Sequence, residues 1–384
     1  MLGTYVGLQV PQPSAGPASS CMASGPTWTA ATAPTVGTFS SSLPVYGGGV
    51  WVALSSVGGA GVRSTNNGAS WSSVSPGAGE WKRIAYGNGT FVAVAGNASP
   101  SQLAATSADG QTWTSGARMP SPRYWYALGF GNGVFLAVAY SGGTGTLAMA
   151  RSTDGVTWTS LTAPASSNWR QVAYGSGKWV LVSESSYLSY TSTDDGSSWS
   201  AGGTIPAIGP IFNLAFGGGV FIASAGTNKV AVSANAGASW TEVTLPFTGS
   251  TAAPAYHGGM WVIQGSGANV GKVAISEDGY TWAEKSVPLT SVLAWGGSGL
   301  RFVGVSPAAG VAIYGECPSG ASPVPAAPAG IVAAMSTKQL SLSAQMAGAI
   351  GAPAAPVLEV GICGMHHGTS YQFGATVLVS ARDR

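Results

Sequence analysis

Seven tryptophans recur along this 384-residue chain at steps of 43, 42, 45, 41, 41 and 42 residues. A period of this size is typical of repeat architectures, in which each unit buries its apolar face against its neighbours. A chain of this length can therefore be one array of like units rather than several unrelated domains. The aligned positions are Trp28, Trp71, Trp113, Trp158, Trp199, Trp240 and Trp282.

Each unit carries the signals of four short strands. A Gly-rich turn leads into alternating apolar residues, as in "GNGTFVAVA" (87–95), and a third strand such as "LAMARS" precedes an Asp/Gly turn and the tryptophan. Short strands bounded by Gly and Asn, without helical periodicity, indicate an all-β protein. The sequence predicts a seven-bladed β-propeller of four-stranded antiparallel blades. The first strand of each unit ends in an aromatic residue: Tyr46, Tyr86, Phe130, Tyr174, Phe216, Tyr256 and Trp295.

The two ends of the repeat array predict how the ring closes. The last unit has three strands and no fourth, whereas "GPTWTAA" (25–31) is a fourth strand with no unit before it. We expect these to share one blade. Cys21 and Cys317 flank the shared strands, so they are expected either to form a disulfide or to lie close together as thiols, while Cys363 is left over.

The sequence around this array divides the chain into four segments. Residues 1–20 are expected to be an N-terminal arm, 21–317 the propeller, 318–330 a Pro/Ala linker and 331–384 a small β-rich segment for docking or assembly. The last segment is too small to be expected to fold alone.

The turn before six of the seven tryptophans, all but Trp28, has the pattern Ser-x-Asp/Asn-(x)-Gly-x-x-Trp. It resembles the Asp-box, or BNR repeat, of sialidase-like propellers. That resemblance implies a structural role, remote from any active site, and the residue chemistry agrees: Asp, Asn and Ser fix hairpin turns, Gly supplies a positive φ, and Trp packs. The predicted clip residues are Asn66 with Trp71, Asp109 with Trp113, Asp154 with Trp158, Asp194 with Trp199, Asn235 with Trp240, and Asp278 with Trp282.

Composition narrows the class of function. Only 7% of residues are charged, against roughly a quarter in ordinary soluble domains. The net charge of +2, without a Lys/Arg cluster, gives no reason to expect nucleic acid, and neither a signal peptide nor a membrane span is recognised. These features suit a virion or extracellular protein, such as a phage tail or capsid accessory component, which contacts other virion proteins through 1–20 and 331–384 and assembles as a homo-oligomer.

Catalytic residues are sparse. The sialidase Arg-Ile-Pro element is missing, sialidases have six blades, and six of the 13 acidic residues fall in the repeated turns. A glycosidase needs two carboxylates across a cleft, and only Glu80 is expected on a suitable loop. The segment "CGMHH" (363–367) is a poor zinc site, because its three potential ligands share one short stretch. We therefore expect no enzyme activity, metal or cofactor, with a glycoside hydrolase as the alternative.

Three neighbouring blades differ from the other four. Trp81, Trp125 and Trp169 occupy equivalent positions in the loops before the first strands, where the other blades have Ile211, Thr251, Thr290 and Ser41. Aromatic platforms beside polar groups suit sugar rings, so a host-surface glycan or receptor site is predicted there. The competing interpretation is that these tryptophans pack between blades. The remaining predicted ligand-binding residues are Lys82, Arg83, Arg123, Tyr124, Tyr126 and Arg170.

Three functions make different predictions. An adhesin binds without turnover, a glycosidase needs a carboxylate pair on the Trp81 face, and a purely structural decoration protein buries the three tryptophans.

Overall fold

The computed structural model describes residues 22, 24–36, 43–56, 58–96, 103–121, 123–140, 148–165, 167–289, 291, 294–297, 301–306 and 310–316, with the backbone alone of 364–367 and 370–373. The chain divides into two compact units, residues 1–321 and 322–384. The second unit contains one described hairpin, β29 (Gly364–His367) and β30 (Ser370–Phe373). Cys21, Cys317, Cys363 and the segments 1–20 and 318–330 lie outside the described residues, so the expectations for them stay predictions.

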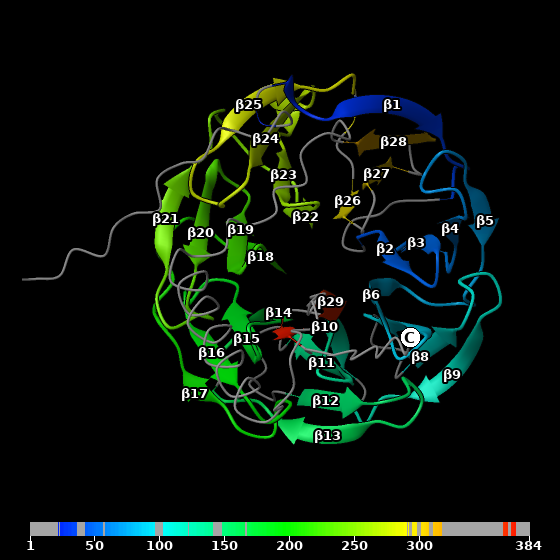
Figure 1. The fold of residues 1–384 in the computed structure, drawn as a ribbon. Coiled ribbons are helices and arrows are strands. Elements are labelled where there is room, and N and C mark those ends of the chain that lie inside the picture. The colour runs from blue at the N-terminus through cyan, green and yellow to red at the C-terminus, as the bar shows by residue number, and fades with distance from the viewer. Residues whose placement is uncertain are drawn as a thin grey trace, which may run out of the picture. The chain divides into compact units, whose positions relative to one another are not determined.

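The first unit is a ring of seven four-stranded antiparallel sheets (Figure 1), which confirms the predicted propeller. Almost no helix is present in the described residues; the turn η1 (Gly267–Asn269) follows β23. Blade one contains β2 (Val45–Gly47), β3 (Val50–Leu54), β4 (Gly61–Ser64) and β5 (Ser72–Val74), and blade two contains β6 (Trp81–Gly87), β7 (Thr90–Ala95), β8 (Leu103–Ser107) and β9 (Thr114–Arg118). Blade three contains β10 (Tyr124–Gly131), β11 (Val134–Tyr140), β12 (Ala148–Ser152) and β13 (Thr159–Thr162). Blade four contains β14 (Trp169–Gly175), β15 (Lys178–Ser183), β16 (Ser189–Ser192) and β17 (Ser200–Ala201).

The remaining blades continue the same strand order, and the last one is closed by the N-terminal strand. Blade five contains β18 (Ile211–Gly217), β19 (Val220–Ala225), β20 (Lys229–Ser233) and β21 (Thr241–Thr244); blade six contains β22 (Ala255–His257), β23 (Met260–Gln264), β24 (Lys272–Ser276) and β25 (Ala283–Ser286); blade seven contains β26 (Ala294–Gly297), β27 (Phe302–Ser306), β28 (Val311–Glu316) and β1 (Thr27–Thr32). Strand β1 pairs with β28 from Thr27 opposite Glu316 to Thr32 opposite Val311. Ring closure by the N-terminal strand is therefore confirmed.

The second strand of each blade forms the centre of the core. In β3, β7, β11, β15, β19, β23 and β27, most residues are buried on both faces, because neighbouring blades pack against each side. This explains why these strands read as nearly continuous apolar runs in the sequence. The outer strands are exposed and rich in Ser and Thr, which gives a surface with few charges.

The repeated turn is a hydrogen-bonded clip between the third and fourth strands. In blade four, the Ser192 hydroxyl donates to Asp194 Oδ1 (2.7 Å) and accepts from the Gly196 amide (2.9 Å), while Trp199 Nε1 donates to the Gly196 carbonyl (3.1 Å). The turn glycines have φ between 72° and 87°, a region that side chains disfavour. The same serine-to-Asp/Asn hydrogen bond recurs in the other five turns, at Ser64, Ser107, Ser152, Ser233 and Ser276.

The Asp194 clip predicts a defined acid dependence of stability. Hydrogen bonds from the Ser198 hydroxyl and amide and from Ser192 lower the pKa of the Asp194 carboxyl from 3.8 to about 2. A carboxyl whose pKa is depressed in the folded protein stabilises it above the unfolded pKa and loses that contribution as pH falls through the folded pKa. Asparagine fits the same turn, since Asn66 keeps the hydrogen bond from Ser64.

We therefore expect Asp194→Asn to unfold more easily than the native protein at neutral pH. It should also lose less stability than the native protein between about pH 4 and about pH 2. Urea unfolding across this range checks both statements. Glu277→Gln, which removes an exposed carboxylate next to another clip residue, is the charge-matched control. Parallel pH dependences for Asp194→Asn and the native protein would contradict the assignment.

Candidate functional site

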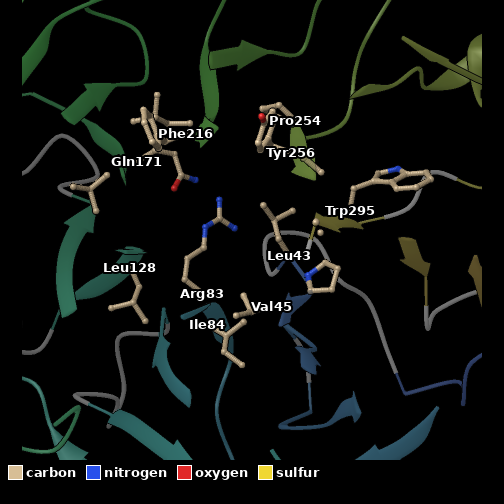
Figure 2. Close-up of a pocket in the computed structure, with 16 residues that line it drawn as sticks. Leu43, Val45, Arg83, Ile84, Leu128, Gln171, Phe216, Pro254, Tyr256 and Trp295 are labelled. Atoms are coloured by element: carbon tan, nitrogen blue, oxygen red, sulfur yellow. The ribbon is translucent and has the colours of Figure 1, made fainter. Parts of the chain in front are cut away.

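The first strands of the seven blades surround a central channel. A cavity of about 240 Å³ lies in it, and every blade contributes at least one lining residue (Figure 2). The lining residues are Leu43, Pro44, Val45, Arg83, Ile84, Leu128, Gln171, Val172, Leu214, Phe216, Pro254, Ala255, Tyr256, Trp295, Gly296 and Gly297. Among these described residues, Arg83 is the one charged side chain.

A β-bulge directs Arg83 into this channel. Trp81 pairs with Ala95 and Arg83 with Val94, so Lys82 is an extra residue in the ladder. Because Ala95 and Val94 are consecutive, the side chains of Trp81 and Arg83 leave opposite faces of the sheet, whereas a regular strand would place them on the same face. Trp81 therefore packs in the core while the guanidinium of Arg83 extends toward Gln171 (Figure 2).

The environment of Arg83 disfavours its charge. Only 7% of the residue is exposed, and its one hydrogen bond among the described residues goes from a guanidinium nitrogen to the Lys82 carbonyl at 3.3 Å. Burial first, and then the positive charge of Arg170, lower the pKa of Arg83 to about 10, although Tyr126 acts in the opposite direction. A buried cation is costly unless it is paired, so an anion in the channel would be stabilised there.

A second group of side chains lies beside Arg83 on blades three to five; we call Tyr126, Tyr140, Arg170, Glu184 and Phe212 the rim cluster. The Arg170 guanidinium carbon lies 4.2 Å from the centre of the Tyr126 ring and 5.3 Å from that of Phe212. Arg170 also forms an ion pair with Glu184 at 3.8 Å. Burial, and then the charge and hydrogen bonding of Glu184, raise the pKa of Tyr140. The rim cluster therefore combines aromatic faces with a cation already stacked on them.

The predicted tryptophan platform is wrong. Trp81, Trp125 and Trp169 are 0% exposed, and each indole nitrogen donates to a backbone carbonyl four residues earlier, at 3.2, 3.2 and 3.0 Å. Ile211 occupies the equivalent place before the bulge of blade five and is also 0% exposed. The position is a core site filled by a large side chain in three blades, so no sugar ring can stack on these indoles. The three tryptophans instead pack in the core, as the competing interpretation predicts.

The other predicted ligand-binding residues are divided between the channel, the rim and the outer surface. Tyr126 and Arg170 belong to the rim cluster, and Arg83 belongs to the channel. Lys82 forms an ion pair with Glu80 at 3.1 Å, Tyr124 is 47% exposed, and Arg123 is half-buried. The structure therefore does not gather the nine predicted residues into one site.

Sequence reasoning missed Gln171, which lines the channel and donates from its amide nitrogen to the Phe212 carbonyl at 2.9 Å. A signal for it exists. The residues that follow the bulge in blades two to five are Arg83, Ala127, Gln171 and Asn213. Three of these four are polar, although the rest of each first strand after this position is built of aliphatic and aromatic residues and glycine.

The two carboxylates beside the channel and the rim cluster are paired with cations: Glu80 with Lys82 and Glu184 with Arg170. Away from this region, Glu284 lies on the outer strand β25 and pairs with Lys272 at 2.9 Å. Within the described part of the chain, no group of three or more His, Cys, Asp or Glu could hold a metal ion, and no helix is long and apolar enough to cross a membrane.

These features define the class of the protein as a seven-bladed β-propeller. No protein-family model matches the chain, and no curated protein matches its sequence. Solved structures of similar fold exist. A catalytically inactive virginiamycin B lyase from Staphylococcus aureus with quinupristin has a TM-score of 0.63 at 12% identity, covering 76% of this chain and 99% of that one. YCF48 bound to D1 peptide has a TM-score of 0.57 at 16% identity, covering 76% of this chain and 95% of that one.

A chain in the mitotic checkpoint complex is a third structure of similar fold, with a TM-score of 0.59 at 12% identity and coverage of 83% of this chain and 99% of that one. At these identities the likeness shows the fold alone. The three proteins include a lyase and a peptide complex, so the fold does not choose between catalysis and binding.

Proposed function

We propose that this chain is a non-enzymatic binding protein built on an Asp-box propeller, and that its central channel and rim cluster form the ligand site. The Asp-box assignment is supported by the serine, Asp/Asn and glycine hydrogen bonds that recur in six turns. The six clips are alike and hold hairpins, so they have a structural role. The residues that line the channel differ from blade to blade, and we therefore place the ligand there.

The observation that carries the proposal is the kind of side chain that lines the channel. A glycosidase places two carboxylates on either side of its substrate. The described lining residues instead provide a cation, an amide and apolar walls, and the nearby carboxylates of Glu80 and Glu184 are held in ion pairs. This arrangement suits binding better than hydrolysis.

The biological setting we propose is the surface of a phage virion, on a tail or capsid accessory protein that displays the propeller to a host-surface glycan or receptor. A charge-poor outer surface of Ser and Thr supports this setting, and segments 1–20 and 331–384 would contact other virion proteins. A second candidate, a purely structural decoration protein, is favoured by one observation, the burial of Trp81, Trp125 and Trp169.

Binding without turnover is the expected result on a glycan array and on host cells. Tyr126→Ala, which removes one face of the Arg170 stack, should weaken binding at least tenfold. Tyr280→Ala should leave it unchanged, because this exposed tyrosine belongs to a clip between β24 and β25. Mass spectrometry of the array supernatant checks for released product.

The outcomes separate the candidates. Product release would establish the glycosidase. If the folded protein bound no glycan or cell but was still recovered in virions, the decoration role would replace the binding role. Equal losses for the Tyr126 and Tyr280 variants would remove the rim cluster from the site.

A further inference from the structure

Arg83 gives the central channel a chemical preference that the proposed function leaves open. We infer that the channel binds a carboxylate-bearing group of the ligand, with Arg83 as its cation. This inference rests on the proposed function, because it names the chemical class of ligand for the same site.

The first argument is the uncompensated charge. Arg83 is nearly buried, lines the cavity, and makes one hydrogen bond to protein among the described residues, whereas its guanidinium has five N–H donors. Two neighbouring cations have carboxylate partners: Lys82 has Glu80 and Arg170 has Glu184. Arg83 differs from these two because it lines the cavity and no described carboxylate pairs with it.

The second argument is size and wall chemistry. A cavity of about 240 Å³ is smaller than the roughly 300–1,000 Å³ of pockets that hold drug-sized ligands, so it takes one small group. Leu43, Val45, Ile84, Leu128 and Leu214 line the same cavity and offer apolar surface, while Arg83, Gln171 and Tyr256 offer polar groups. A small group that carries an anion beside an apolar part can use both kinds of wall.

The third argument is the kind of anion. A guanidinium matches a planar carboxylate through two parallel N–H···O bonds. One carboxylate also balances one arginine, whereas a phosphate monoester would bring an excess of negative charge to a cavity with a single lysine or arginine among its described lining residues. A carboxylate is therefore preferred to a phosphate.

The test uses benzoate and its neutral isostere benzamide as probes, measured by isothermal titration calorimetry on the full chain. Benzoate should bind and benzamide should bind at least tenfold more weakly, with inorganic phosphate weaker than benzoate. Arg83→Met should weaken benzoate binding at least tenfold. Arg63→Met, which removes a cation that donates to the Asp109 carbonyl on the blade surface, should leave it unchanged.

A second readout guards against a folding defect. Arg83→Met replaces a buried, uncompensated charge by an apolar side chain. The melting temperature of the ligand-free variant should therefore be higher than that of the native protein. A lower melting temperature would show that Arg83 has a structural partner and would overturn the inference. Equal affinity for benzoate and benzamide, or tighter binding of phosphate, would also overturn it.

These results are separable from the fate of the proposed function. If cell or glycan binding depends on Tyr126 but benzoate does not bind, the carboxylate inference is wrong and the binding role stands. If benzoate binds through Arg83 but no cell or glycan is bound, the carboxylate site stands and the proposed partner is wrong.

Discussion

A chain that begins at Ala33, and so lacks strand β1, is expected to melt about 10 °C below a chain that begins at Met22. Strand β1 pairs with β28 along all six of its residues. Its Trp28 ring lies edge-on to Trp295 at 5.3 Å, and it covers Gly315, where a Cβ would lie 2.3 Å from the indole. Removing β1 takes this packing from blade seven and leaves β28 with an unpaired edge, which favours association.

Thermal unfolding and size-exclusion chromatography of the two chains check this expectation. Both chains lack Cys21, so a disulfide to Cys317 cannot account for a difference between them. A synthetic peptide of residues 22–36 should restore part of the lost stability when added to the shorter chain, because it supplies the missing strand. Equal melting temperatures for the two chains would show that β1 does not hold the ring closed.

The blade count and the closure could be predicted because each depends on a local signal that repeats. Gly turns, alternating apolar residues and the Trp of each clip identify every strand, and the unpaired strand around Trp28 follows from counting. These signals survive because each blade packs against its neighbours in the same way, so the same side chains are needed at the same places.

The site was harder to predict because it depends on a bulge. Trp81 and Arg83 are two residues apart, and period-two alternation assigns them to one face of the strand. The extra residue Lys82 reverses this relation and buries the tryptophan while it turns the arginine into the channel. A bulge has no strong sequence signal of its own, so the alternation of the strand places Trp81 and Arg83 in one ligand site instead of separating the core tryptophan from the channel arginine.

The contacts between blades one to six follow a rule that the sequence also contains. The glycine that ends the first strand of one blade receives the aromatic ring of the next blade, because a Cβ there would lie 2.0–2.2 Å from ring atoms. The pairs are Gly47 with Tyr86, Gly87 with Phe130, Gly131 with Tyr174, Gly175 with Phe216, and Gly217 with Tyr256. In blade six the position is His257, whose ring lies edge-on to Phe302 of blade seven at 5.3 Å, so this step of the ring is built differently.

Gly131→Ala is therefore expected to reduce the free energy of unfolding by about 3 kcal/mol, at the upper end of the usual cost of overpacking. Its new Cβ would lie 2.2 Å from both Cβ and Cγ of Tyr174, and the Cβ is fixed by the backbone, so a rotamer change cannot move it away. Gly271→Ala is the matched control, because a Cβ there meets its nearest atoms at 3.6 Å and its φ is not positive. Urea unfolding of both variants measures the difference. If the two substitutions cost the same, the close contact between Gly131 and Tyr174 does not set the spacing of blades three and four.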